Sequence, residues 1–245
     1  MSAKKYDVYA IGNAIVDYEI EVDNAFLEAN GVEKGLMTLA EQDRQDGLLR
    51  AAKSNIRKKQ AGGSAANSVV ALAQLGGTGF YSCKVASDVD GTFYRDDLVE
   101  QGVATNLSDA KFDEGVTGKC LVMITPDAER TMSTFLGISS NLSLSELNLD
   151  QLENSHYLFL EGYLVSSPSG FEAIKEAKKR TKTVDVKTAL TFSDPSMVKY
   201  FGDQMHEVVG EGVDLLFCNE EEARLYAGTD DLTQAIEKLK KITKN

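Results

Sequence analysis

The segment Gly62-Gly63-Ser64-Ala65-Ala66-Asn67 constrains the fold of this chain more than any other feature. Two consecutive glycines let the backbone approach a ligand closely, and apolar residues at helical spacing over 66–73 predict a helix directly after them. Ser64 has the side chain of a good N-cap, and Gly76-Gly77 ends the helix. Asn67 falls in the exposed first turn, where free N–H groups attract polar or anionic ligand groups. We therefore interpret the segment as a ligand-binding loop at a helix N-terminus.

The rest of the chain alternates between short apolar strands and amphipathic helices. Strands are predicted at Val8–Gly12, Gly79–Lys84, Tyr157–Glu161, Ala189–Ser193 and Asp214–Cys218. Helices are predicted at Ser64–Leu75, Asp90–Gln101, Pro168–Arg180, Pro195–Val209, Glu220–Tyr226 and Leu232–Ile242. This alternation is typical of a mainly parallel sheet covered by helices on both faces, an α/β fold that binds ligands beyond the carboxyl ends of its strands.

Two stretches interrupt the alternation. Residues 13–61 contain strand-like pieces around a helical segment, and residues 115–136 have the pattern of a hairpin that turns at Pro126-Asp127-Ala128-Glu129. Together they predict a small β layer over the strand ends, which has the form of a lid.

Charge and composition exclude several partners. The chain has 26 basic and 38 acidic residues, a net charge of −12, and no local basic cluster that would offset it. This balance repels nucleic acid and anionic membranes. No apolar stretch approaches the roughly 18 residues of a membrane span, so no membrane partner is expected.

Cysteine and histidine usage indicates the compartment. Cys83, Cys120 and Cys218 are odd in number, widely spaced and associated with apolar runs, which is typical of buried thiols in a reducing cytoplasm. We therefore expect a cytoplasmic protein. His156 and His206 are the two histidines of the chain, which argues against a histidine metal site.

Polar residues follow the first predicted strand. Asn13 comes directly after its last glycine, and Asp17 lies shortly beyond. A carboxylate accepts paired hydrogen bonds from sugar hydroxyls without a metal, so Asp17 is a candidate ligand-binding residue. The alternatives are an Asp17 that faces water on a lid strand and an Asn13 that only forms a turn. The glycine fingerprint of a dinucleotide-binding fold is absent here, which argues against an oxidoreductase.

With these residues the chain resembles the PfkB family of carbohydrate kinases, the ribokinase and adenosine kinase group. Besides the glycine segment, the resemblance rests on Gly12-Asn13 with Asp17, Ser87-Asp88-Val89-Asp90-Gly91, Arg130, Asp194-Pro195 and Asn219-Glu220-Glu221-Glu222. It covers nearly the whole chain, and the long segment between Asp17 and Gly62 looks closer to the adenosine kinase branch than to bacterial ribokinase. It implies a ribokinase-like three-layer α/β domain over 1–245 with a small β lid. The implied activity is ATP-dependent transfer of the γ-phosphate to a hydroxyl of a sugar or nucleoside.

The resemblance also implies residue roles. Substrate hydroxyls are bound by a set of polar and glycine residues, namely Asn13, Asp17, Gly62, Gly63 and Asn67. Arg130 closes toward the substrate and the transferred phosphate; the alternative is an exposed turn residue. Asn219 and Glu222 organise ATP and Mg²⁺, with Glu222 acting through water. The same pair also fits a helix capping box, and both roles can hold together.

The substrate stays open between sugar and nucleoside. Glu161 ends an apolar strand, so it either points at the ligand cleft, where it suits sugar hydroxyls, or is paired in the core. The resemblance to adenosine kinases implies an aromatic pair here, of which this chain keeps one ring, Tyr163, and has Leu164 where a second ring would help to hold a purine. Both Glu161 and Tyr163 are therefore candidate substrate-binding residues.

The family's Gly-Ala-Gly-Asp motif, which holds the catalytic base, does not occur in this sequence. We expect a C-terminally incomplete kinase whose base lies beyond Asn245 and which binds substrate better than it catalyses. The competing hypothesis is a non-catalytic sugar- or nucleoside-binding protein. A homodimer through the lid is a further expectation.

Overall fold

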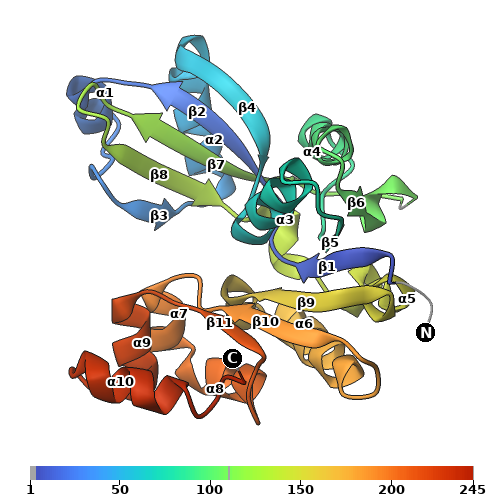
Figure 1. The fold of residues 1–245 in the computed structure, drawn as a ribbon. Helices are drawn as coiled ribbons and strands as arrows, with labels where there is room; N and C mark the ends of the chain where they lie inside the picture. The colour runs from blue at the N-terminus through green and yellow to red at the C-terminus, as the bar shows by residue number, and fades with distance from the viewer. Residues whose placement is uncertain (1–3, 110, 245) are drawn as a thin grey trace.

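The main sheet of the computed structural model, which describes residues 4–109 and 111–244, has six parallel strands. Their order is β11 (Leu215–Phe217), β10 (Lys187–Thr191), β9 (Ser155–Glu161), β1 (Tyr6–Ile11), β5 (Gly79–Ser82) and β6 (Ala104–Thr105). The strand order reverses at β1: β5 and β6 follow on one side of it, and β9, β10 and β11 are added later on the other side. Figure 1 shows that the loops after these central strands open toward a second, smaller sheet.

Helices pack on both faces of the main sheet. One face, with Tyr9, Leu158 and Leu190, buries its side chains against α5 (Leu149–Glu153), α6 (Pro168–Thr181) and α8 (Gly202–Val209). The other face, with Ala10 and Tyr81, packs against α3 (Ser64–Gln74) and α4 (Val89–Glu100). The C-terminal end of the chain adds α7 (Pro195–Tyr200), α9 (Glu220–Ala227) and α10 (Leu232–Leu239).

The second sheet is the lid. Its strand order is β3 (Met37–Leu39), β8 (Arg130–Phe135), β7 (Gly118–Ile124), β2 (Ile15–Glu21) and β4 (Ile56–Gly62). Strand β7 is antiparallel to β8 and parallel to β2, which in turn is antiparallel to β4. Helices α1 (Asn24–Ala29) and α2 (Gln42–Ala51) belong to the same part of the chain, and α2 covers the face of the sheet that lies away from the cleft.

The lid therefore forms from the two stretches that interrupt the sequence alternation, as the pattern predicts. The predicted strands and helices of the main layer are also present, with ends shifted by a few residues. The predicted helix 195–209 is instead two helices, because the backbone of Phe201 leaves the helical region between them. Gly63, not Ser64, is the N-cap of α3, because its φ of 105° lies outside the helical region while Ser64 is already the first residue of the helix.

Short elements were beyond the reach of the sequence pattern. Strands β3 and β6, helices α1 and α5, and several 3₁₀ turns are too brief to show a periodicity. The 3₁₀ turns lie at Lys53–Asn55, Asn106–Ser108, Gly137–Asn141, Leu144–Glu146 and Gly162–Ser166. Within the described ranges, no helix is both long and apolar enough to cross a membrane.

Candidate active site

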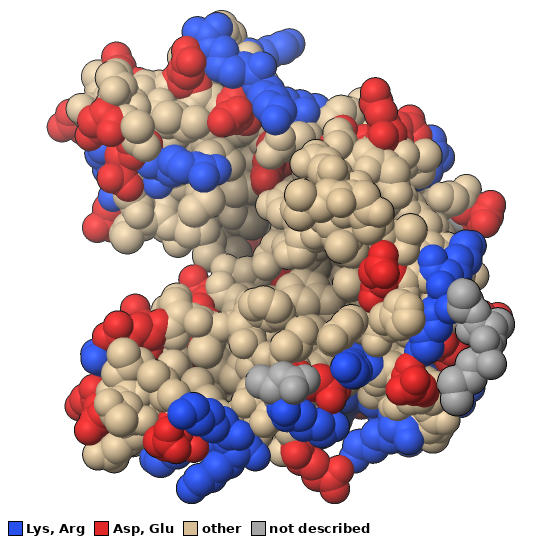
Figure 2. Space-filling view, viewed as in Figure 1, with Lys and Arg blue, Asp and Glu red and all other residues tan. Residues whose placement is uncertain are grey.

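A cleft separates the lid from the main layer, and Figure 2 shows the hollow between them. The residues predicted to bind substrate come from the loop after β1, from β2, and from the junction of β4 with α3. These segments meet at one side of the cleft because β1 and β4 lead directly into it.

Gly63 is the point of closest approach between two of these segments. Its φ of +105° is a conformation that side chains other than glycine rarely adopt, and a Cβ there would overlap the carbonyl oxygen of Asn13. The Gly63 carbonyl accepts a hydrogen bond from Asn67 N at 2.9 Å, which begins α3. The loop of Asn13 is held from below by Tyr81, whose hydroxyl donates to the Asn13 carbonyl at 3.0 Å. Asn13, Gly63 and Asn67 are therefore neighbours.

Asp17 lies directly over Gly62. A Cβ on Gly62 would overlap the Asp17 carboxylate, so glycine is required for the acid to occupy this place. Burial raises the pKa of Asp17 to about 6, Arg130 opposes the rise, and Glu19 adds to it. The structure thus brings Asp17 to the glycine segment, as the sequence predicts, and does not leave it facing open water.

The lid surface is apolar on the β7 side of Asp17. Asp17 pairs in register with Cys120 on β7, and the buried side chains of Ile15, Cys120 and Val122 form one cluster. Ile124, Met132 and Leu136 pack against this cluster from the edge. A carboxylate flanked by apolar side chains suits a ligand with a polar and an apolar half.

Arg130 begins β8 on the same lid. Its side chain is exposed, and no ion pair with it is found in the part of the chain that the structure describes. It is close enough to Asp17 and Cys120 to act on the pKa of both groups by its charge. Arg130 therefore lies on the cleft side of the lid, where an anionic group could reach it.

Glu161 sits beneath the cleft rather than in it. The residue is 1% exposed, and its carboxylate accepts hydrogen bonds from Asn13 N, Asn13 Nδ2 and Ala65 N. Of the two alternatives that the sequence left open, the structure favours pairing in the core. Burial raises the pKa of Glu161 to about 7, against the effect of those three hydrogen bonds.

Tyr163 lies near the lid and also near the residues that follow β10 and β11. Burial raises its pKa to about 12, and the nearby carboxylates of Asp194, Glu161 and Glu222 add to the rise. Cys120 of the lid is also close enough to contribute. The half-buried ring of Tyr163 therefore lies between the lid and the acidic residues that follow β10 and β11.

Asn219 and Glu222 form the capping box of α9. Asn219 N and Nδ2 each donate to Glu222 at 3.0 Å, and Glu222 N donates to Asn219 Oδ1 at 2.9 Å. Glu222 is 4% exposed, and its pKa is raised by burial and then by Asp194 and Glu221. With both oxygens engaged, Glu222 fits a hydrated cation at most through water. The nearby Asp194 and Glu221 carboxylates make the region attractive to Mg²⁺, which keeps several of its waters.

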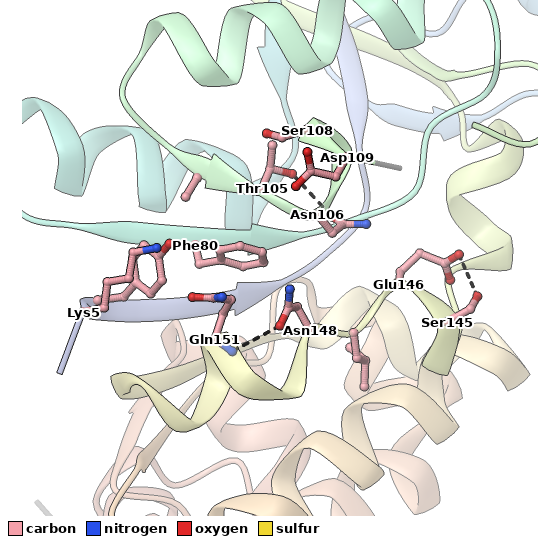
Figure 3. A pocket seen from close by; sticks show the side chains of 13 residues that line it. Lys5, Phe80, Thr105, Asn106, Ser108, Asp109, Ser145, Glu146, Asn148 and Gln151 are labelled. Carbon is pink, nitrogen blue, oxygen red and sulfur yellow. Dashed lines mark hydrogen bonds between the residues drawn. The ribbon is translucent and has the colours of Figure 1, made fainter. Parts of the chain in front are cut away.

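Elsewhere the surface has a cavity of about 390 Å³ between the β5–β6 edge and α5 (Figure 3). It contains none of the predicted site residues. A second hollow, of about 480 Å³, lies over the open face of β9, β10 and β11 beside α3 and is lined mainly by apolar side chains such as Phe159, Leu215 and Phe217. The residues that the structure describes contain no cluster of three or more His, Cys, Asp or Glu suited to a metal ion.

Sequence reasoning missed the supporting groups. Tyr81 and Tyr94 are fully buried, and their hydroxyls donate to the carbonyls of Asn13 and Gly62 at 3.0 and 2.8 Å. Tyr81 could have been found as a tyrosine in a predicted buried strand, since a buried hydroxyl needs a partner, whereas Tyr94 precedes Arg95-Asp96-Asp97 and carries no such signal. The apolar lid surface carries no motif at all.

The chain is similar in sequence to curated nucleoside kinases. The guanosine-inosine kinase of Escherichia coli (strain K12) is 25% identical over 238 residues, which are 94% of this chain and 55% of that protein. The adenosine kinase of Schizophyllum commune is 25% identical over 234 residues, covering 91% of this chain and 64% of that protein. The chain thus spans about half to two thirds of the length of these curated relatives.

Solved structures give the same fold. The crystal structure of adenosine kinase from Sinorhizobium meliloti has a TM-score of 0.87 at 35% identity, with 98% of this chain and 73% of that chain covered. A probable sugar kinase from Rhizobium etli CFN 42 has a TM-score of 0.88 at 29% identity, with coverage of 98% and 72%. The fold is therefore ribokinase-like, with sugar and nucleoside kinases as homologues. Residues 41–245 match the family described as pfkB family carbohydrate kinase, and the chain belongs to that family.

Proposed function

We propose that this chain carries the substrate-binding part of an ATP-dependent kinase that phosphorylates a hydroxyl group of a nucleoside. The observation that carries the proposal is the position of Asp17, whose carboxylate lies over Gly62 beside the apolar lid cluster of Ile15, Cys120 and Val122. The names of the relatives, which include adenosine and guanosine-inosine kinases, support the same substrate class.

A nucleoside fits both halves of this surface. The Asp17 carboxylate can accept hydrogen bonds from two neighbouring ribose hydroxyls, with Asn67 in the exposed first turn of α3 as a further polar group. The base would cover the apolar lid side chains, which a free sugar would leave in contact with water. Tyr163 offers a ring at the border of the same cleft.

The phosphate side of the reaction belongs to the other end of the cleft. ATP supplies the transferred phosphoryl group, and Mg²⁺ neutralises its charge. Asp194, Glu221 and Glu222 are the acidic residues that would attract the hydrated cation, with Glu222 acting through water. Arg130 on the lid would face the transferred group from the opposite side.

Calorimetric titration of the chain with adenosine, inosine, guanosine and ribose tests the proposal. We expect one of the nucleosides to bind at least 10-fold more tightly than ribose. The Asp17→Asn variant should lose most of that affinity, while Asp96→Asn, an exposed change on α4, should keep it. Equal affinity for ribose and every nucleoside would contradict the nucleoside assignment. Nucleoside binding without phosphoryl transfer from MgATP by the whole protein would instead support the binding-protein hypothesis.

A further inference from the structure

The carboxylate of Glu161 lies between two separate walls of the proposed nucleoside site. Oε1 accepts hydrogen bonds from Asn13 N and Asn13 Nδ2, both at 3.2 Å, in the loop after β1. Oε2 accepts one from Ala65 N, at 2.8 Å, in the first turn of α3. One side chain from β9 therefore joins two segments that the sequence separates by a long stretch of lid.

The surrounding backbone is shaped to this carboxylate. A Cβ on Gly12 would come within 2.5 Å of Glu161 Oε2 and 2.7 Å of Ala65 Cβ, so residue 12 has to be glycine for the three groups to meet. Gly63 closes against the carbonyl of Asn13 from the other side. The Asn13 carbonyl is in turn held by the hydroxyl of Tyr81.

The Ala65 N–H is one of the free donors at the start of α3. Such donors, with the positive end of the helix dipole, usually attract an anion. Here the buried carboxylate of Glu161 accepts the hydrogen bond from Ala65 N in place of a bound anion. No lysine or arginine of the described residues forms an ion pair with Glu161. The negative charge is therefore stabilised by backbone and amide dipoles alone, and it stays out of contact with ligand.

We propose that Glu161 is a positioning residue, which sets the relative position of the Asn13 loop and the α3 N-terminus and thereby the shape of the site for nucleosides. The proposal rests on the proposed function for the identity of the ligand. The ionised carboxylate accepts from all three donors, and its charge strengthens each hydrogen bond. Replacement by an amide places an N–H donor against one of these donors, and protonation removes the charge and weakens the acceptors, so either change loosens the contact with one wall.

The connection that Glu161 makes between the Asn13 loop and α3 therefore depends on pH. The titratable groups that face Glu161 are Tyr81 in β5, Cys83 directly after β5, Tyr94 on α4 and Tyr163 after β9. Burial is the main cause that raises the pKa of each, so all four stay neutral near pH 7. The pKa of Glu161 itself is raised to about 7. Glu161 is thus the group in this set that changes charge around neutral pH.

The test follows the backbone amide NMR signals of Asn13 and Ala65 in the ligand-free protein from pH 5 to pH 9. We expect both signals to shift together with one midpoint near 7, and Glu161→Gln to abolish the shift. Asp17→Asn should leave it in place, which separates Glu161 from the other acid of the site. Independent midpoints at the two amides, or no shift in the wild type, would overturn the proposal.

Nucleoside affinity provides the second readout. At pH 8 we expect Glu161→Gln to weaken binding of the preferred nucleoside about 10-fold, and Glu161→Asp, which keeps the charge but shortens the reach, to fail to restore it. Glu146→Gln is the control, because Glu146 is bound by Lys84, Ser143 and Ser145 and bonds to neither the Asn13 loop nor α3, so its loss should affect folding alone. Wild-type affinity in Glu161→Asp would contradict the positioning role of Glu161. If the wild-type protein binds no nucleoside but shows the shared amide shift, the proposed function is wrong, and the connection between the two segments through Glu161 is still supported.

Discussion

At the scale of single residues, the site contains an ionised group, Asp17, that lowers the stability of the folded protein. Asp17 is held against Gly62 in a partly buried position, where its pKa is about 6 instead of the ordinary 3.8. The folded state binds the proton of Asp17 more tightly than the unfolded chain does, so stability falls as the pH rises from about 4 to about 6 and stays lower above that range. A residue that lowers stability in its working form is best explained by a role in binding.

Asp17→Asn should therefore raise stability and lower affinity. Above pH 7 we expect the free energy of unfolding to increase by about 1 kcal/mol, after a discount for solvent contact, and the gain to disappear below about pH 4, where the acid is protonated in both states. Nucleoside affinity at pH 8 should fall roughly 100-fold, because charge-assisted hydrogen bonds are lost. Urea unfolding at several pH values and calorimetric titration measure the two effects. A variant that loses stability and affinity alike would point to a structural role only.

The glycine beneath the acid gives a second prediction at this scale. Gly62→Ala places a methyl group on the Asp17 carboxylate, so we expect a 10-fold or greater loss of nucleoside affinity in the same titration. Gly47→Ala on α2 is the matched control, since no atom lies within 4 Å of its added methyl group. The control should keep its affinity and gain a few tenths of a kcal/mol or more in stability from helix propensity. Unchanged affinity in Gly62→Ala would show that the carboxylate can move without consequence.

At the scale of elements, α4 binds the lid through hydrogen bonds and ion pairs to three of its strands. Asp90 in its first turn is buried and accepts a hydrogen bond from Tyr18 at 2.5 Å, with Lys59 Nζ at 2.7 Å and Lys119 Nζ at 3.2 Å. These three partners come from β2, β4 and β7, so one carboxylate holds three lid strands. Further along the helix, Asp97 accepts from Ala61 N at 2.6 Å.

Asp90→Asn should loosen the lid. Burial acts to raise the pKa of Asp90, but the bonds from Lys59 and Tyr18 outweigh it and hold the pKa below its ordinary value, so this contribution is present at neutral pH and lost in acid. Removing the charge leaves two lysines without their partner, and we expect a loss of about 2 to 3 kcal/mol at pH 7. Urea unfolding measures the loss, and hydrogen exchange should become faster in β2, β4 and β7. Asp96→Asn, on the exposed side of α4, should change neither quantity.

At the scale of the whole molecule, the lid and the main layer face each other across an open cleft. Figure 2 shows the hollow, and Figure 1 shows that the lid joins the main layer on one side, beside α3 and α4. Such an arrangement allows the lid to turn about its attached side. Arg130 and Asp17 on the lid would then approach the acidic groups after β10 and β11, which excludes water from the reacting groups.

Lid closure can be measured by energy transfer between two labelled thiols. Cys218 is exposed after β11, whereas Cys83 and Cys120 are buried, so Glu129→Cys at the lid tip adds a second accessible site. We expect transfer efficiency to rise when nucleoside is added. The control pair, Cys218 with Lys199→Cys in the main layer, should not respond. An unchanged signal in the lid pair at saturating nucleoside would argue for a rigid lid.

The sequence pattern was enough to predict the α/β alternation and the lid, and the family resemblance implied that Asp17 and the glycine segment belong to one site. The alternation and the lid follow from the apolar period and the turn residues, whereas Asp17 reaches Gly62 through the antiparallel pairing of β2 with β4. The need for glycine at 62 and 63 is equally readable, because both positions require close approach of the backbone and Gly63 also has a positive φ.

The tertiary structure decided the rest. Whether Glu161 faces ligand or core, and whether Glu222 is free or tied into its cap, depends on which backbone donors reach each carboxylate. The three partners of Asp90 come from strands far apart in the chain, and no local pattern connects them. Sequence pattern determines which side chains can point together; only packing determines which buried charges find their partners, because hydrogen bonding at about 3 Å is a property of the assembled fold.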